Sequence, residues 1–307
     1  MNNQNTNTQV YAQKVELLLR LIPIVMEEGV FAIHGGTAIN LFLKNLPRYS
    51  VDIDLTYIPL CDRTTSLDDI NNHLKSISEK AKKAFKGMHI VPNFSTCKLL
   101  CEYRGKQVKI EVNQTKRGIV GGDVLTIPLS DKAQEEFSLY CEANIVSLTL
   151  LYGGKIAAAL SRQHPRDLFD VKYMELPMTQ CREGFIFCLL GSDRPIHESF
   201  SPSLIDQREA MENQFEGMTD VPFTYGEFEE TRAKLIAEVN NLMTDADRHF
   251  LVSFELAEPD WEGYEFEYFK EYPSVQWKLL NLQKLAKQNP KKLKEEADKL
   301  KHIFNVE

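Results

Sequence analysis

The chain has 307 residues, which is enough for one large domain or two modest ones with a hydrophobic core. Its 43% hydrophobic and 26% charged residues are typical of a soluble globular protein, and no apolar run approaches the roughly 20 residues of a membrane span. The net charge of −8 argues against a protein that coats nucleic acid non-specifically, but it is compatible with a local basic groove. We therefore expect a cytoplasmic protein without a membrane segment.

Hydrophobic periodicity divides the front half of the chain into helices and strands. We expect helices over residues 10–28, 37–46 and 67–86, and strands over 30–33, 51–58, 88–94, 97–103 and 107–114. Thr37 is expected to cap the second helix, and the turn around Gly105 to join the last two strands as a hairpin.

The back half of the chain is predicted to be mainly helical. It begins with an expected helix over 144–162, and the Pro-containing stretches 192–202 and 219–224 are candidate linkers. The predicted fold class is α+β, with an N-terminal domain over 1–143 that has a mixed β-sheet and flanking helices. A C-terminal helical domain is expected over 144–307.

Gly35 and Gly36 stand between the first predicted strand and the helix after it. Glycine lets a backbone approach a phosphate closely, and the new helix offers unpaired N–H groups and a positive dipole end. A Gly-Gly pair before a helix is also a common tight turn, so this feature alone is a weak signal.

Asp52 and Asp54 lie two residues apart on the next predicted strand. Alternate strand residues share a face, so the two carboxylates converge, with Cα atoms about 6–7 Å apart. Hard oxygens in this arrangement suit Mg²⁺, with triphosphate oxygens completing the coordination. Two solvated carboxylates on an edge strand are the alternative interpretation.

Glu111 lies in a β-rich run between Ile110 and Val112. A third carboxylate on a neighbouring strand would complete an acidic cluster for two metal ions. On its own, Glu111 is equally typical of a surface residue on a half-exposed strand.

These three features, in this order, resemble the DNA polymerase β-like nucleotidyltransferase superfamily. More narrowly, Ile33–Ile39 and Arg48–Leu55 are similar to the GGTA and R-x-S-x-D-[IL]-D-L signatures of the AbiEii/AbiGii-type toxin family. Members of that family are nucleotidyltransferases of abortive-infection and toxin–antitoxin systems. The resemblance covers residues 30–290, with small departures at Ile39 and Tyr49. It implies that 1–143 is the catalytic domain and that 144–307 completes the active-site cleft and the acceptor surface.

A second block of charged residues, 155–170, looks like the family's K-x-x-A…R…R-D-x-x-D motif. It contains the cations Lys155, Arg162 and Arg166 and the acids Asp167 and Asp170. We expect Lys155 to meet the nucleotide's phosphates, with Arg162 and Arg166 beside it, because a point charge on a long stem suits triphosphate recognition. The resemblance implies that Lys155 and Asp167 or Asp170 take part in catalysis. An Arg–Asp network that ties two helices together is the structural alternative.

The expected reaction is transfer of a nucleoside monophosphate from an NTP, with release of pyrophosphate. Gly35, Gly36 and Thr37 would hold the phosphates, and Asp52, Asp54 and Glu111 would bind Mg²⁺ or Mn²⁺. Ser50 lies beside this nucleotide site, and a phosphate on its hydroxyl would place negative charge next to the carboxylates and block nucleotide binding.

The resemblance implies an RNA acceptor, with the 3′ end of tRNA favoured, and a separately encoded antitoxin as partner. Residues 98–117 carry a local excess of four cations, which would suit a phosphate track. The lysine-rich stretches 80–86 and 284–301 are alternatives, although such runs usually form solvated helix faces.

Three other functions are compatible with parts of the pattern. The chain could transfer the nucleotide to a protein hydroxyl, and nothing in the sequence separates this from RNA as the acceptor. A degenerate transferase that only binds nucleotide is disfavoured by the intact Asp52 and Asp54. A DxD glycosyltransferase is disfavoured by the order of the Gly-Gly turn and the DxD strand.

Overall fold

The computed structural model describes residues 2–306 and consists of two compact units. Unit 1 runs to Ser147 and also includes Glu209–Pro222, whereas unit 2 comprises Leu148–Arg208 and the chain from Phe223 onward. The chain passes from unit 1 back to unit 2 between Pro222 and Phe223, which lies within the predicted linker at 219–224. The predicted linker at 192–202 is wrong, because this stretch lies inside unit 2 and buries Ile196 and Phe200 there.

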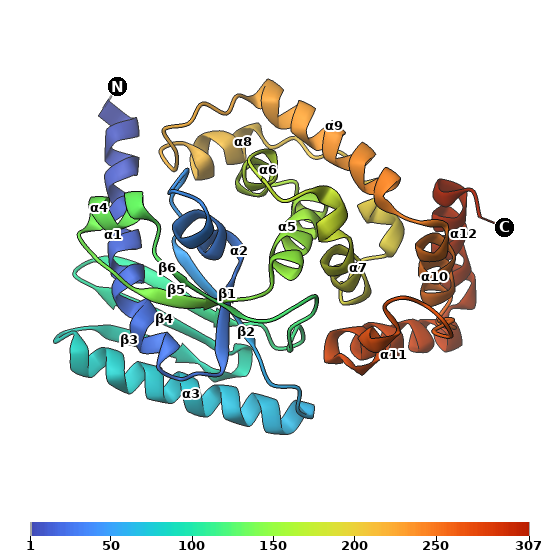
Figure 1. Ribbon diagram of the computed structural model, residues 1–307, viewed down its shortest axis with the longest axis horizontal. Coiled ribbons are helices and arrows are strands. Elements are labelled where there is room, and N and C mark those ends of the chain that lie inside the picture. The colour runs from blue at the N-terminus through green and yellow to red at the C-terminus, as the bar shows by residue number, and fades with distance from the viewer. Residues whose placement is uncertain (1, 307) are drawn as a thin grey trace. The chain divides into compact units, whose positions relative to one another are not determined.

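A mixed sheet of seven strands forms the centre of unit 1 within the described range (Figure 1). Its order is β3-β4-β5-β2-β1-β7-β6, with parallel pairing of β2 with β5 and of β1 with β7. The strands are β1 (Phe31–His34), β2 (Asp52–Tyr57), β3 (His89–Asn93), β4 (Lys98–Tyr103), β5 (Lys106–Val112), β6 (Leu125–Pro128) and β7 (Glu142–Ile145). The predicted mixed sheet with flanking helices is confirmed.

Strands β6 and β7 were not expected, and the helix predicted from residue 144 is wrong in its first residues. Asn144 and Ile145 belong to β7, and α5 begins only at Leu148. A four-residue run such as Glu142–Ile145 has too few positions to reveal a period, and its pairing partner β1 lies far away in the sequence.

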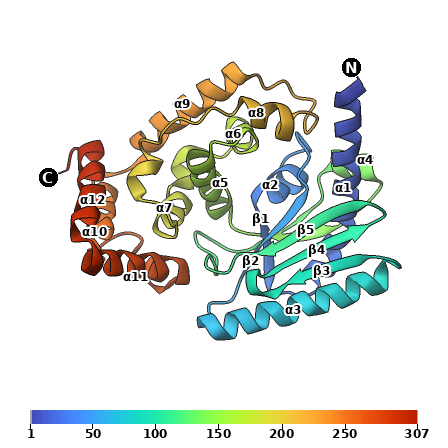
Figure 2. The same ribbon diagram turned by 180° about the vertical axis from the view of Figure 1, so that it is seen from behind.

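The sheet of unit 1 has one apolar face and one polar face. The apolar face carries Ile53, Leu55, Ile110 and Val112, all at most 1% exposed. The helices α1 (Asn2–Met26) and α3 (Arg63–Ala84) pack on this face, and α3 lies across β3 and β4 (Figures 1 and 2). The opposite face carries Asp52, Asp54, Lys109 and Glu111, because strand residues alternate between faces.

The segment Glu209–Pro222 returns to unit 1 after the first part of unit 2. It includes the one-turn π-helix η5 (Met211–Phe215), and it buries Phe215 and Met218. The backbone N–H of Tyr49 donates to the carbonyl of Met218 at 2.7 Å, and the hydroxyl of Thr219 donates to the carbonyl of Pro47 at 2.7 Å. The returning segment therefore holds the loop that leads into β2.

Unit 2 is helical in the part of the chain that the structure describes. Its main helices are α5 (Leu148–Arg162), α6 (Pro165–Lys172), α7 (Arg182–Leu190), α9 (Tyr225–Leu242), α10 (Asp245–Glu255), α11 (Pro273–Gln288) and α12 (Pro290–Phe304). Within residues 2–306, no helix has both the length and the apolar character that crossing a bilayer demands.

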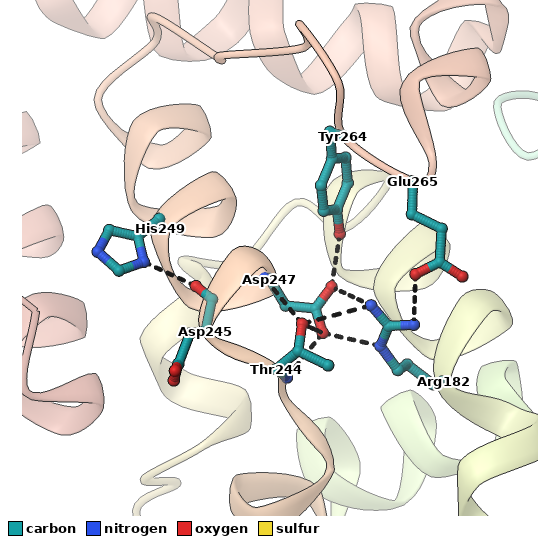
Figure 3. Close-up of polar contacts among 7 residues, drawn as sticks. All are labelled: Arg182, Thr244, Asp245, Asp247, His249, Tyr264 and Glu265. Carbon is teal, nitrogen blue, oxygen red and sulfur yellow. Dashed lines mark hydrogen bonds and ion pairs between the residues drawn. The ribbon is translucent and has the colours of Figure 1, made fainter.

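A buried ion pair joins α7, α10 and the loop that follows α10 (Figure 3). Asp247 is fully buried and accepts hydrogen bonds from the guanidinium of Arg182, from Tyr264 and from the N–H and hydroxyl of Thr244. Burial alone would raise the pKa of Asp247, but these donors outweigh it and hold the pKa below its usual value. Asp247 is therefore a structural carboxylate whose oxygens are fully used.

Two glycines allow α5 and α7 to pack with their backbones in direct contact. A Cβ atom on Gly153 would lie 2.3 Å from the carbonyl carbon of Gly184, whereas one on the adjacent Gly154 would lie 3.7 Å from Cys188 Sγ. Only the first of these distances is incompatible with a side chain.

We expect Gly153→Ala to destabilise unit 2 by about 3 kcal/mol, because the methyl group forces the two helices apart. Gly154→Ala is the matched control, since it adds the same methyl group to the same helix where there is room. It should leave stability unchanged or raise it by about 0.5–1 kcal/mol. Urea unfolding followed by circular dichroism measures both changes, and equal effects of the two substitutions would contradict the packing described here.

Candidate active site

The chain turns sharply at the end of β1, where Gly35 has a φ of +73°. A Cβ atom on Gly35 would lie 3.3 Å from Asp54 Oδ2, and one on Gly36 would lie 2.7 Å from Arg48 Nη2 and 2.8 Å from Ser50 Oγ. The glycines therefore bring this turn directly against Asp54 and the loop before β2.

Helical structure begins at Gly35 itself, as α2 (Gly35–Thr37), and continues as the π-helical segment η1 (Ala38–Leu43). The prediction that Thr37 caps the helix is wrong, because Thr37 lies inside it with helical dihedral angles. Its buried hydroxyl donates to the carbonyl of Asp52 at 2.5 Å and lies 3.1 Å from Ser50 Oγ. Thr37 thus ties the turn to the start of β2, and Ser50 is buried beside it at 9% exposure.

Asp52 and Asp54 share the polar face of the sheet, and both are half-buried. The strand pairings place Lys109 opposite Asp52, and Glu111 and His34 on the two sides of Asp54. His34 is held by a 3.0 Å hydrogen bond between its Nδ1 and Thr56 Oγ1. The three predicted carboxylates therefore lie on two adjacent strands of one face.

Glu111 is engaged by two lysines of the same face. Its carboxylate forms ion pairs of 2.9 Å with both Lys98 and Lys109. Desolvation alone would raise the pKa of Glu111, but hydrogen bonds from these lysines hold it below its usual value. The pKa of Lys109 is raised, because its hydrogen bond to Glu111 and the charges of Asp52 and Asp54 outweigh its desolvation.

The donor set fits one divalent cation better than a ready-made cluster for two. Within the described residues no three His, Cys, Asp or Glu side chains are grouped closely enough to hold a metal ion. In the part of the chain that is described, the carboxylate of Asp54, unlike that of Asp247, accepts no hydrogen bond from a side chain. Its hard oxygens, with those of Asp52 on the same face, are of the kind that Mg²⁺ prefers.

The predicted residues of the 155–170 block form a separate group in unit 2. Helix α5 ends at Arg162 and α6 begins at Pro165, so the expected bend is present. Lys155 Nζ forms ion pairs of 2.9 Å with both Asp167 and Asp170. Arg162 Nη2 lies 2.8 Å from Asp167, with its side chain 62% exposed.

These contacts make Lys155 and the two aspartates a buried ionic group. Lys155, Asp167 and Asp170 are each at most 6% exposed. Burial alone would raise the pKa of Asp167, but the charges of Lys155 and Arg162 hold it below its usual value. Arg166 is half-exposed and forms no ion pair within the described residues, so it is not part of this group.

Sequence reasoning missed the roles of Lys98 and Lys109 beside the carboxylates. Lys109 could have been found, because it lies two residues before Glu111 and therefore shares its face. Lys98 could not, because its position opposite Glu111 depends on the register of the β4–β5 hairpin.

We expect Lys155→Met to destabilise unit 2 by about 3–5 kcal/mol, because two buried carboxylates lose their common cation. Lys234→Met, at a lysine that is 76% exposed, is the control and should change stability by less than about 1 kcal/mol. Unfolding in urea measures both effects, and equal stability of the two variants would contradict a buried ionic group.

The same substitution changes the response to acid. The lowered pKa of Asp167 contributes stability that is complete above its unfolded value of 3.8 and is lost as the pH falls through its folded value. Without Lys155 the folded pKa rises, so acid unfolding should begin at a higher pH in the variant than in the wild type.

Solved structures support the assignment of the fold. MenT4, a nucleotidyltransferase toxin from Mycobacterium tuberculosis, is 12% identical and matches 91% of this chain and 94% of its own with a TM-score of 0.61. At this identity the likeness shows the α+β fold alone. A tRNA-processing enzyme in an apo form is 13% identical over 91% of this chain and 79% of its own, but its TM-score of 0.25 is too low for a structural argument.

Comparison of sequences identifies the family. No curated protein matches the chain in sequence. The family model described as "Nucleotidyl transferase AbiEii toxin, Type IV TA system" matches residues 16–279, which is most of the chain and includes both charged groups. The chain therefore belongs to the AbiEii family of nucleotidyltransferase toxins of type IV toxin–antitoxin systems.

Proposed function

We propose that this nucleotidyltransferase moves a nucleoside monophosphate from an NTP to RNA, with the 3′ end of tRNA as the favoured acceptor. The observation that carries the proposal is the pairing of β2 and β5, which sets Asp52 and Asp54 beside Lys109 and Glu111. The turn lies directly against Asp54 at Gly35 and against Arg48 and Ser50 at Gly36. Nucleotidyl transfer needs acids that bind a cation, a backbone turn that binds phosphates and a positive charge such as a flanking lysine.

In the proposed site the turn receives the triphosphate. The backbone N–H groups at the start of α2 have no helical partner, so those of Gly35, Gly36 and Thr37 are suited to phosphate oxygens. The hydroxyl of Thr37 is already used within the protein, so its contribution is the backbone N–H. Ser50 lies against Gly36, and a phosphate on it would occupy the same space.

Asp52 and Asp54 would hold Mg²⁺ or Mn²⁺, which when bound neutralises phosphate charge and polarises the α-phosphate. Lys109 lies opposite Asp52 and offers a positive charge to the leaving pyrophosphate. The acceptor hydroxyl attacks the α-phosphorus, the bond to the bridging oxygen breaks, and the proton of the hydroxyl passes to a carboxylate of this face. Glu111 would join Asp52 and Asp54 only after releasing Lys98 and Lys109.

The charged group of unit 2 supplies further proposed nucleotide contacts. Arg162 and Arg166 have exposed or half-exposed guanidinium groups that could bind phosphate. Lys155, Asp167 and Asp170 would act on the nucleotide only if their buried ion pairs opened. A cognate antitoxin is the partner that membership of a toxin–antitoxin family implies.

We expect Asp52→Asn to reduce transfer by at least about 10³-fold, because the cation loses one of its two carboxylates while the side-chain volume is kept. Glu102→Gln is the matched control, since Glu102 is an exposed acid on the same face of the sheet, and it should keep wild-type activity. The assay incubates each protein with Mg²⁺, total RNA and each labelled NTP in turn.

The position of the label tests the acceptor as well as the site. We expect label in a tRNA-sized band with the wild type and with Glu102→Gln, but not with Asp52→Asn. Label on protein would replace RNA with a protein hydroxyl as the acceptor. Equal activity of Asp52→Asn and the wild type would remove Asp52 from the active site.

A further inference from the structure

Five cations gather at one end of the sheet of unit 1, around the β4–β5 hairpin. Lys82, Lys83 and Lys86 come from the end of α3 and the loop after it, and Arg104 and Lys106 come from the hairpin. We call these five residues the hairpin cluster. Lys106 is half-exposed and the other four are exposed.

Two aromatic rings join the parts of the hairpin cluster. Phe85 contacts Tyr103 edge to face, with 5.5 Å between ring centroids. The guanidinium of Arg104 lies over the ring of Tyr103 at 5.1 Å, and Lys106 is the strand partner of Tyr103. Lys82 is close enough to Cys101 on β4 to influence its pKa. The cluster is therefore one surface built from two elements that are separate in the sequence.

Among the described residues, the cations of the hairpin cluster differ from the lysines of the polar face of the sheet in having no ion-paired acid. Lys98 and Lys109 both form ion pairs with Glu111, and Lys80 forms ion pairs with Glu27 and Glu28. In the described part of the chain, no member of the cluster forms an ion pair, although Glu79 and Glu102 are close in sequence. Such a local surplus of positive charge contrasts with the net charge of −8 of the whole chain.

The ordinary role of lysines at a helix end explains only part of the cluster. Cations in the last turn of a helix are stabilised by its dipole, which accounts for Lys82 and Lys83 in α3. The dipole effect is confined to the last turn and does not account for Arg104 and Lys106 on another element. Like charges gathered from two elements repel one another and favour binding of a polyanion.

The hairpin cluster lies at the same end of β5 as the residues opposite Asp52. Lys106 is three residues before Lys109, which is paired with Asp52, so its side chain leaves the sheet on the α3 face, opposite the face that carries the carboxylates. At the usual strand rise, Lys106 is about 10 Å along the sheet from the level of Asp52. A nucleic-acid strand bound by the cluster would therefore pass around the β4–β5 turn to reach the polar face.

We propose that the hairpin cluster binds the phosphate backbone of the RNA acceptor next to the end that receives the nucleotide. The inference rests on the proposed function, because it assumes that the acceptor is RNA. Contacts to phosphates position a strand without reading its sequence, so the cluster would set where the acceptor lies and not which bases it carries.

The test compares two triple variants with the same change in net charge. Lys83→Glu, Lys86→Glu and Arg104→Glu together alter the hairpin cluster, and all three side chains are exposed, so the fold should persist. Lys287→Glu, Lys292→Glu and Lys294→Glu together alter the C-terminal lysine-rich stretch and serve as the control. Binding of a labelled tRNA transcript is measured without NTP at several salt concentrations, and circular dichroism checks the fold.

We expect the cluster variant to bind the transcript at least about tenfold more weakly than the wild type, and the slope of log Kd against log salt to fall by about two to three. The control variant should stay within about twofold of the wild type. In transfer assays the KM for tRNA should rise in the cluster variant, while kcat at saturating tRNA and the KM for NTP stay unchanged.

Equal tRNA binding by the two variants, whether both are intact or both weakened, would overturn the inference. If the wild type still labels RNA in that case, the proposed function stands and only the location of the acceptor is wrong. If the wild type neither binds the transcript nor labels RNA, the RNA acceptor is wrong and the inference falls with it.

Discussion

The parallel pairing of β2 with β5 determines which charges meet in unit 1. It sets Asp52 against Lys109 and Asp54 against Glu111, and the apolar residues between them face α1 and α3. A shift by one residue would turn the carboxylates into that apolar layer, where an unpaired charge is very costly. The hydrophobic core therefore fixes the register, and the register fixes the geometry of the candidate active site.

Two kinds of carboxylate contrast within this protein. Asp247 and Asp167 are buried with cations and hydrogen-bond donors that use their oxygens fully, and they hold helices together. Asp54 is half-buried and receives no such donors in the described chain. The polar face of the sheet carries Asp52, Asp54 and Glu111 with Lys98 and Lys109, and hard carboxylate oxygens of this kind suit a divalent cation.

Strands β1 to β5 and helix α3 could be predicted from the sequence, and so could the approach of the glycine turn to the strand that carries Asp54. These depend on short-range patterns, such as the alternation in β2 and the residues of the β4–β5 turn. The strand β7 could not be predicted, because four residues pair with a partner more than one hundred positions away. The burial of Lys155 could not be predicted either, since the bend before Pro165 brings Asp167 and Asp170 back against it.

Chain order has a consequence for how this protein is made. Unit 1 contains the carboxylate pair, yet Glu209–Pro222, which holds the loop before Asp52, is translated only after Leu148–Arg208. A ribosome must therefore make a large part of unit 2 before unit 1 can be completed. A nascent chain that is interrupted before this point carries Asp52 and Asp54 without the segment that holds the loop before them, so truncated products of synthesis lack a complete unit 1.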